Sequence, residues 1–359
     1  MGSPLMRLRR QEGRFASSAR QIEADLRRCR SSAACLKIYV TSNEIPEEAI
    51  KILSGLGGVK VNPTSGPPTR EDLFAEIHDA DAILCLLTEK IDGELLNNAG
   101  RLKVIANMAV GYDNIDLADA TRRGILVTNT PGVLTDTTAD TAMALILSVA
   151  RRIVEADRYV RDGKWTIPWS PMMMVGTDVH GKTLAIYGLG RIGEVLAKRA
   201  RGFDMKIIYH SASRKPGLEA KYEMEYVSLE EALGSCDFFS IHVPLRPETR
   251  HSIGARELSL MKETAYLINT SRGQVVDQAA LIEALGQHRI AGAGLDVFEE
   301  EPVPQSSPLL GMNNVVLLPH IGSGSKETRT SMAVRAAGNI ASALRGMRPP
   351  DLVNRDVLQ

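Results

Sequence analysis

The sequence has 359 residues, enough for about two domains with separate cores. Its 43 basic and 43 acidic residues leave no net charge that would favour a nucleic acid or an anionic membrane as a partner. The most apolar run, residues 142–150, is less than half of the ~20 residues that a membrane-spanning helix needs. Four scattered cysteines without a Cys-x-x-Cys pair indicate reduced thiols, and we therefore expect a globular cytoplasmic protein.

Residues 1–35 differ in composition from the rest of the chain. They contain eight arginines, no lysine and only three acidic residues, Glu12, Glu23 and Asp25. An Arg-rich, acid-poor leader is typical of an organelle transit peptide. Because the three acids weaken that pattern, we favour a basic extension that is frayed, disordered or helical, and we keep organelle targeting as the alternative.

From Leu36 onward, short β-rich runs alternate with helical patterns. In the first part of the chain, strands are expected at 37–41, 59–61, 82–87, 104–105 and 125–127, and helices at 47–56, 69–78, 91–98 and 116–123. Alternation of this kind predicts a parallel sheet covered by helices on both faces.

A long helical pattern over 135–155 leads into an irregular segment with two tryptophans, Trp165 and Trp169, and three consecutive methionines. Apolar side chains outside a core usually pack on another surface, and a second copy of the chain is the obvious candidate. A second, larger α/β unit follows, and residues 326–345 form a closing helix that could pack on the first domain. Strands of this unit are expected at 183–187, 206–209, 238–242, 265–268, 292–296 and 315–318.

Three glycines follow the strand 183–187 at the spacing of a dinucleotide-binding turn: Gly188, Gly190 and Gly193. The first permits a tight turn, the second lets backbone approach a pyrophosphate, and the third lets the helix lie close to the strand. Backbone N–H groups at the start of that helix, around Arg191 and Ile192, would hold the diphosphate. An ordinary glycine-rich turn is the alternative, but the strand, turn and helix together favour the dinucleotide site.

The loop after the next strand bears on which dinucleotide is bound. An acid in this loop would hold the ribose of NAD, but none is present. Instead, Ser211 and Ser213 can hydrogen-bond a phosphate, and Arg214 and Lys215 can neutralise it. We therefore expect a preference for NADP(H), with NAD(H) as the alternative if the two cations are only solvated loop charges.

Three further polar segments follow strands of the second unit, where ligands of open parallel sheets bind. Arg272 suits a carboxylate because its planar guanidinium donates two parallel hydrogen bonds. His320 can deliver a proton near neutral pH, and a carboxylate such as Glu301 would hold the imidazole in its charged form. Taken singly, each of these residues has an ordinary surface role as its alternative. No pattern in the chain predicts a metal site.

These segments together resemble the D-isomer-specific 2-hydroxyacid dehydrogenases, over almost the whole chain from Leu36 onward. The resemblance is carried by 188–193, Ser271-Arg272-Gly273, 294–302 and Pro319-His320-Ile321-Gly322. The segments 107–116, 129–136 and 350–355 are similar to those of the glyoxylate/hydroxypyruvate reductase branch.

The resemblance implies a role for each position. His320 would be the acid/base, Glu301 its partner, and Arg272 the group that binds the substrate's carboxylate and keto oxygen. The substrate would also meet the backbone N–H groups of Val110 and Gly111, the apolar wall at Leu87, and Trp169 from a partner subunit. Further residues would contact the cofactor: Thr138, Val243, Pro244, Asp296 and Gly322.

The resemblance further implies two Rossmann-like doubly wound parallel-sheet α/β domains with the active site in a cleft between them. A substrate domain would comprise 36–133 and 319–359, and a dinucleotide domain 134–318. The activity expected is reduction of glyoxylate and hydroxypyruvate to glycolate and D-glycerate by a homodimer. The alternatives are a D-lactate or D-3-phosphoglycerate type dehydrogenase, or a dinucleotide-sensing corepressor. The chain departs from close relatives at Ala212, where an additional arginine is common, and in its arginine-rich leader.

Overall fold

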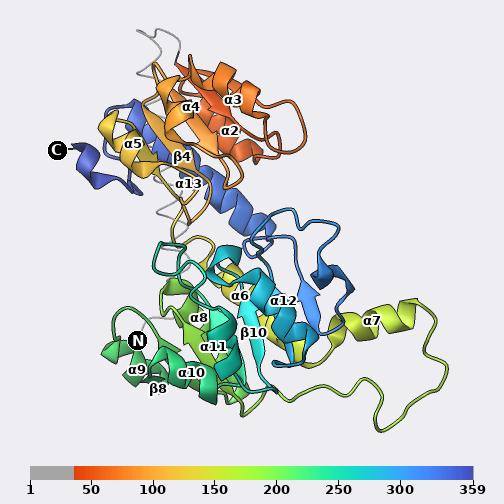
Figure 1. Cartoon of the computed structure of the whole chain (residues 1–359). Coiled ribbons are helices and arrows are strands. Elements are labelled where there is room, and N and C mark those ends of the chain that lie inside the picture. The colour runs from red at the N-terminus through yellow and green to blue at the C-terminus, as the bar shows by residue number, and fades with distance from the viewer. Residues whose placement is uncertain (1–35, 359) are drawn as a thin grey trace, which may run out of the picture. The chain divides into compact units, whose positions relative to one another are not determined.

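The computed structural model describes residues 36–358, so the expectations for residues 1–35 lie outside the described residues. The chain forms two compact units, a first unit of residues 36–131 with 329–358 and a second unit of residues 132–328 (Figure 1). Residues 319–328, expected in the first domain, lie with the second unit. Each unit is built on a sheet of parallel strands, which confirms the predicted fold class of two Rossmann-like α/β domains. Within 36–358, no helix is both long and apolar enough to cross a membrane.

The sheet of the first unit has the strand order β2-β1-β3-β4-β5. Its strands are β1 Lys37–Val40, β2 Gly58–Val61, β3 Ala82–Cys85, β4 Val104–Asn107 and β5 Leu126–Thr128. Its helices are α2 Glu47–Ser54, α3 Arg70–Ile77, α4 Gly93–Asn97 and α5 Leu117–Arg122. Every residue of β3 and β4 is buried, as expected for central parallel strands covered on both faces. The strand order reverses between β1 and β3, so the residues that follow these two strands occupy a typical ligand position.

The later segment of the chain completes the first unit with α13 (Lys326–Leu344) and the short 3₁₀ helix η5 (Arg355–Leu358). The side chain of Asn354 accepts the Val127 N–H and donates to the Ile125 carbonyl, both at 2.8 Å, at strand β5. Arg335 of α13 donates two hydrogen bonds to Asp351, at 2.7 and 2.8 Å. The side chain of Asn354 therefore replaces part of the hydrogen bonding that a further strand would give to the edge of the sheet, and the Val353 N–H adds to it with a bond to the Val127 carbonyl at 2.8 Å.

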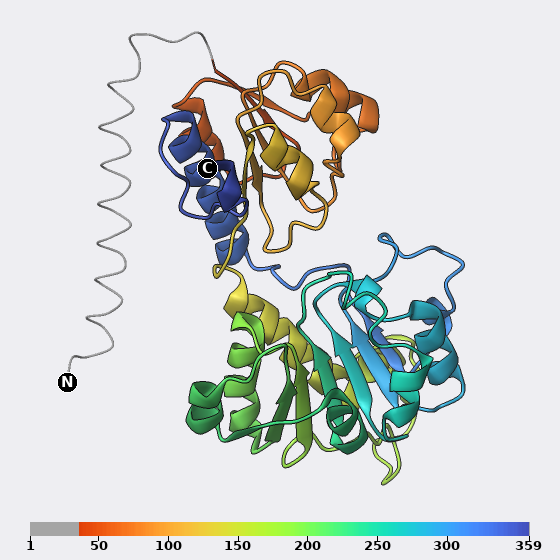
Figure 2. The ribbon, with the colours of Figure 1, turned by 60° about the vertical axis from the view of Figure 1, so that its left-hand side comes forward.

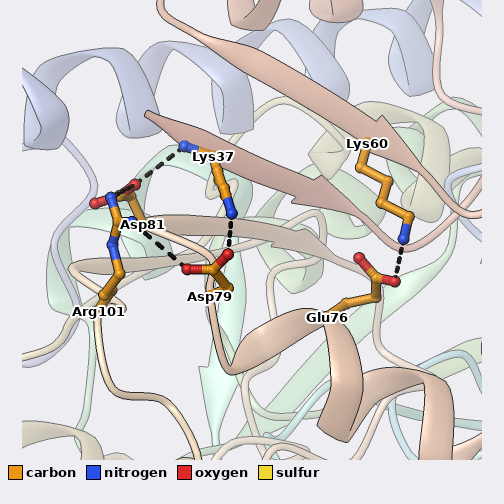
Figure 3. A network of polar contacts seen from close by, with 6 residues as sticks. All are labelled: Lys37, Lys60, Glu76, Asp79, Asp81 and Arg101. Atoms are coloured by element: carbon orange, nitrogen blue, oxygen red, sulfur yellow. Dashed lines mark hydrogen bonds and ion pairs between the residues drawn. The ribbon is translucent and has the colours of Figure 1, made fainter. Parts of the chain in front are cut away.

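A network of charged side chains gathers where β1 and β3 begin (Figure 3). Asp81 is buried and accepts the Lys37 backbone N–H at 3.0 Å and an Arg101 N–H at 2.9 Å. Lys103 lies 3.1 Å from the same carboxylate. Burial raises the pKa of Asp81, but the Lys37 N–H and the two cations outweigh it and leave the pKa below its ordinary value. Asp79, which is half exposed, pairs with Lys37 and Arg101 beside it.

The second unit carries a larger sheet with the strand order β12-β11-β10-β9-β6-β7-β8. Its strands are β6 Thr183–Tyr187, β7 Lys206–His210, β8 Met224–Tyr226, β9 Phe238–Ile241, β10 Tyr266–Asn269, β11 Gly292–Leu295 and β12 Val315–Leu317. Its helices are α6 Thr135–Ala150, α7 Ile153–Arg161, α8 Arg191–Ala200, α9 Pro216–Tyr222, α10 Leu229–Ser235, α11 Ala255–Leu260 and α12 Gln278–Gly286, with 3₁₀ turns η2 Arg201–Phe203, η3 Gly273–Val275 and η4 Pro308–Gly311. One hydrophobic cluster joins the sheet to α6 and α8, and another joins it to α10, α11 and α12. The sheet accordingly lies between two layers of helices (Figure 2).

The predicted single helix over 135–155 is wrong, because α6 ends at Ala150 and α7 begins at Ile153. The Ala150 carbonyl accepts the N–H of Thr177 at 2.8 Å, and Arg152 adopts a left-handed conformation with φ 53°. Gly176 is needed for this approach, since a Cβ there would lie 2.2 Å from the Ala150 oxygen. The helix therefore ends where a distant segment binds its last carbonyl, and α7 extends away from the rest of the second unit (Figure 1).

Candidate active site

The glycine turn lies where the strand order of the second unit reverses, between β6 and β9. Gly188 has φ 100°, and a Cβ on it would lie 2.7 Å from the Val243 nitrogen. A Cβ on Gly193 would lie 2.7 Å from the Gly188 oxygen, so α8 packs closely on the turn. At Gly190, by contrast, a Cβ would meet no atom within 4 Å. The turn thus leaves open space above Gly190, directly before the first residues of α8, Arg191 and Ile192, and this arrangement fits a dinucleotide pyrophosphate.

Several predicted cofactor residues surround this turn. Val243 contacts Gly188 and accepts a hydrogen bond from the Ser271 hydroxyl through its carbonyl, and Pro244 follows on the exposed side. Near the last strands of the sheet, Gly322 contacts both Asp296 and Thr138: a Cβ on it would lie 2.9 Å from an Asp296 oxygen and 3.4 Å from Thr138 Cγ2. The structure therefore brings Val243, Pro244, Asp296 and Gly322 to the ends of strands in one sheet, with Thr138 of α6 beside Gly322.

The loop after β7 carries Ser211, Ser213, Arg214 and Lys215, and it is exposed or half-buried along its length. No acidic side chain occupies positions 211–215. However, the Arg214 guanidinium is already paired with Glu219 of α9, at 2.8 Å. Sequence reasoning missed this partner because Arg214 lies before α9 and is five residues from Glu219, which is not the spacing of a helical pair.

Glu301 and His320 form a close pair, with His320 Nδ1 2.7 Å from Glu301 Oε2. The other carboxylate oxygen of Glu301 accepts the Phe298 N–H at 3.0 Å, which fixes the side chain from behind. Burial raises the pKa of Glu301, but the hydrogen bond from His320, the charge of His320 and the nearby Arg272 outweigh it and hold the pKa below its usual value. An ionised carboxylate on Nδ1 leaves Nε2 as the ring nitrogen able to exchange a proton with a ligand.

Asp296 holds the loop that carries His320. Its two carboxylate oxygens accept the N–H groups of Ile321 and Gly322, each at 2.7 Å, and its carbonyl accepts the His320 N–H at 2.9 Å. Asp296 is buried, and desolvation raises its pKa despite these two backbone hydrogen bonds. Asp296, expected to contact the cofactor, is thus engaged in positioning the histidine loop.

Arg272 comes directly before η3 and donates from Nη1 to the Ser271 carbonyl at 2.9 Å. Asn269, the last residue of β10, donates to the Arg272 carbonyl at 2.9 Å and accepts the Ser271 N–H at 3.0 Å. Gly273 allows the backbone to pass Phe298, since a Cβ there would lie 1.8 Å from the Phe298 carbonyl carbon. The arginine therefore sits on a turn held by strand β10 and by the loop that leads to Glu301.

In the first unit, two asparagines hold Val110 and Gly111, and a third ties the same loop to the turn around Leu87. Asn129 donates to the Val110 carbonyl at 2.7 Å, and Asn107 donates to the Gly111 carbonyl at 2.8 Å. Asn114 donates to the carbonyls of Leu86 and Glu89, at 3.1 and 2.9 Å. Holding the Val110 carbonyl fixes the peptide plane that also carries the Gly111 N–H, so these asparagines orient a predicted substrate-binding group.

Glu89 is a further residue that sequence reasoning missed. It is buried, and it accepts the Leu86 N–H at 2.5 Å, the Thr88 hydroxyl at 2.6 Å and the Thr41 hydroxyl at 2.9 Å. These bonds shape the turn on which Leu87 lies. A carboxylate that follows a strand within a Thr-Glu-Lys run looks like a solvated charge, and no local signal distinguishes it from one.

Trp169 stands apart from these groups. Its side chain is 75% exposed, in an irregular segment that follows α7 and carries other exposed apolar residues. These other residues are Trp165, Ile167, Met172 and Val175. Among residues 36–358, no group of His, Cys, Asp or Glu is arranged to hold a metal ion.

Comparison with known proteins identifies close relatives. Residues 143–322 match the family model described as D-isomer specific 2-hydroxyacid dehydrogenase, NAD binding domain. A glyoxylate reductase of Thermococcus litoralis is 54% identical over 90% of this chain and 98% of its own length. Another glyoxylate reductase, of Korarchaeum cryptofilum, is 51% identical over 90% of this chain and 97% of its own length. The crystal structure of an NADPH-dependent glyoxylate/hydroxypyruvate reductase from Sinorhizobium meliloti with NADP and malonate superposes with a TM-score of 0.77, at 33% identity over 90% and 98% of the two chains.

Proposed function

Because this chain belongs to the D-isomer-specific 2-hydroxyacid dehydrogenase family, whose members are NAD(P)-dependent oxidoreductases, we propose that it reduces glyoxylate and hydroxypyruvate to glycolate and D-glycerate with NADPH. The observation that carries the proposal is the 2.7 Å contact between His320 and an ionised Glu301, in a chain that shares 51% sequence identity with a glyoxylate reductase.

His320 is the proposed proton donor. The carboxylate of Glu301 stabilises the protonated imidazole, so the ring can give its Nε2 proton to the carbonyl oxygen as negative charge develops there. The bound dinucleotide supplies the hydride that the carbonyl carbon receives. Arg272 binds the substrate's carboxylate and its keto oxygen through the planar fork of its guanidinium.

The backbone N–H groups of Val110 and Gly111 are proposed to take the other side of the carboxylate. Leu87 provides an uncharged wall, which suits a small 2-keto acid better than one that carries a phosphate. Trp169 of a partner subunit closes the site. This last role requires a homodimer, for which the exposed apolar residues that follow α6 provide the support.

The cofactor is proposed to be held at the glycine turn, with Gly188, Gly190, Arg191, Ile192 and Gly193 around the pyrophosphate. Asp296, Gly322 and Thr138 lie at the nicotinamide end, and Val243 and Pro244 at the adenine end. Ser211, Ser213, Arg214 and Lys215 favour NADP(H) over NAD(H), because a loop without an acid does not repel a 2′-phosphate. A cytoplasmic location is supported by Cys85 and Cys236, which are buried free thiols.

The decisive experiment is a panel of four 2-keto acids, namely glyoxylate, hydroxypyruvate, pyruvate and 3-phosphohydroxypyruvate, each tested with NADPH and with NADH. We expect the highest kcat/KM for glyoxylate or hydroxypyruvate with NADPH. A higher value for the phosphorylated acid or for pyruvate would refute the substrate assignment, and a higher value with NADH would refute the cofactor assignment. Negligible turnover of every acid would favour a dinucleotide-binding role without catalysis.

A further inference from the structure

The guanidinium of Arg214 is held along one edge by Glu219. Arg214 Nε lies 3.0 and 3.1 Å from the two carboxylate oxygens, and Nη2 lies 2.8 Å from Oε2. The Glu219 side chain is only 12% exposed, whereas that of Arg214 is 65% exposed. The covered carboxylate therefore fixes an exposed cation, and Nη1 takes no part in the pair.

Glu219 is in turn held by Tyr209, a buried residue of β7. The Tyr209 hydroxyl donates to Glu219 Oε1 at 2.7 Å and accepts the Lys215 N–H at 2.7 Å. Burial, together with the neighbouring Glu219, raises the pKa of Tyr209 to about 12, so the hydroxyl keeps its proton and remains a donor. One buried oxygen thus connects the clamp on Arg214 to the backbone of Lys215.

The opposite end of the loop is held by Tyr226 of β8. Its ring packs edge-on against Tyr209, with the ring centroids 5.3 Å apart, and its hydroxyl donates to the Ser211 carbonyl at 3.4 Å. The two tyrosines therefore hold both ends of the 211–215 loop. Within that loop, Arg214 is the only arginine.

We propose that Glu219, fixed by Tyr209, is a positioning residue for cofactor selectivity, which orients Arg214 to recognise the 2′-phosphate of NADP(H). The inference rests on the cofactor preference proposed above. An exposed arginine loses side-chain freedom when it binds a phosphate, and a clamp that removes this freedom beforehand strengthens binding. The negative charge of Glu219 would by itself repel the phosphate. If Glu219 acts by orienting Arg214, removing its charge should weaken binding of the 2′-phosphate. If it acts only by repulsion, removing its charge should strengthen that binding.

The test compares two nucleotides that differ only in the 2′-phosphate, adenosine 2′,5′-bisphosphate and adenosine 5′-monophosphate, by calorimetry on the full chain. We expect Glu219→Gln and Tyr209→Phe each to weaken bisphosphate binding about tenfold, which corresponds to about 1.4 kcal/mol. Binding of the monophosphate should stay within about twofold, and this also shows that the variants are folded. The matched control is Glu225→Gln, which removes a carboxylate of β8 that pairs with Lys206 at 3.4 Å instead.

Tighter bisphosphate binding by Glu219→Gln would overturn the inference and identify Glu219 as a competitor of the phosphate for Arg214. Unchanged binding in both variants would also overturn it. A wild-type chain that binds the two nucleotides equally well would instead refute the proposed preference for NADP(H), and the inference would fall with it.

Discussion

His320 combines an exchangeable proton with an unusual backbone conformation. Its φ of 54° lies in the left-handed region, which is unfavourable for a residue other than glycine. Asp296 holds it there, through the His320 N–H on its carbonyl and the next two N–H groups on its carboxylate. Strain of this kind persists where the surroundings fix it, and such sites are commonly functional.

Replacing His320 by alanine is expected to lower kcat by about 10²–10⁴-fold, because the developing alkoxide loses its proton donor. Cofactor affinity, measured by fluorescence titration, should remain close to that of the wild type. His288→Ala is the matched control, because His288 is an exposed histidine with a similar φ of 53°. Near-wild-type turnover by His320→Ala would refute the assigned role.

Glu301→Gln tests the partner of the histidine. Because the pKa of Glu301 lies below its usual value, the carboxylate is ionised at neutral pH, and the substitution removes a full negative charge beside the ring. Reduction requires a protonated donor, and the carboxylate favours that form. The pH above which the rate of reduction declines should therefore move toward acid in a rate–pH profile. An unchanged profile would show that Glu301 does not support the proton transfer.

At the scale of elements, the first strands of the first unit depend on the charge network at their start (Figure 3). Asp81→Asn should lower the free energy of unfolding by about 1–3 kcal/mol at pH 7, since a buried acceptor of several hydrogen bonds loses its charge. Asp79→Asn is the control, and because its ion pairs are exposed, less than about 1 kcal/mol is expected. Urea unfolding of both variants measures the difference.

The contribution of Asp81 to the free energy of unfolding should also depend on pH. The pKa of Asp81 is lower in the folded chain than its ordinary value of about 4, so the folded state favours the ionised form. Its contribution to stability is fully present above that ordinary value and is lost as the pH falls through the folded pKa. The stability gap between wild type and Asp81→Asn should therefore narrow below pH about 4. A gap that stayed constant from pH 7 to pH 3 would contradict the account.

The elements that could be predicted are those whose own residues show an apolar pattern typical of a buried strand. The runs that form β3, β4 and β9 are mostly apolar and buried throughout, and the sequence predicts strands there. Strand β8 was missed, because it has three residues of which two are exposed. The end of α6 was missed for a different reason: Thr177 and Gly176, far along the chain, determine it through space. Sequence periodicity carries no information about such a contact.

At the scale of the whole molecule, the exposed apolar residues of α7 and the segment after it are proposed to form the interface of a homodimer. None of the residues of α7 is buried, although Ile153, Val154 and Val160 are apolar and exposed. Val160→Glu should convert the dimer to a monomer in sedimentation velocity, because a charge would be buried at the interface. Leu260→Glu, at the exposed end of α11, should leave the dimer intact. A wild-type chain that is monomeric at micromolar concentration would refute the proposal.

The sequence predicts the reacting side chains of the candidate site, but not the residues that hold them in place. Arg272, Glu301 and His320 follow strands of one sheet, and their spacing is visible in the sequence. The roles of Asn129, Glu89 and Glu219 depend on hydrogen bonds to backbone or to side chains whose positions the sequence does not reveal. Supports of this kind resemble ordinary polar surface residues until the strand order is known.

The division of the first unit between residues 36–131 and 329–358 has a consequence for synthesis of the chain. All five strands of the first unit are translated before the second unit, but most of α13 and residues 351–354 are translated only after it. The first unit must wait for Asn354 to complete the hydrogen bonds at the edge of β5. Domains usually fold in the order of their synthesis. In this chain the second unit can therefore complete its fold before the first, which lacks the buried α13 residues Ala336, Ala337 and Ile340 until they have been synthesised.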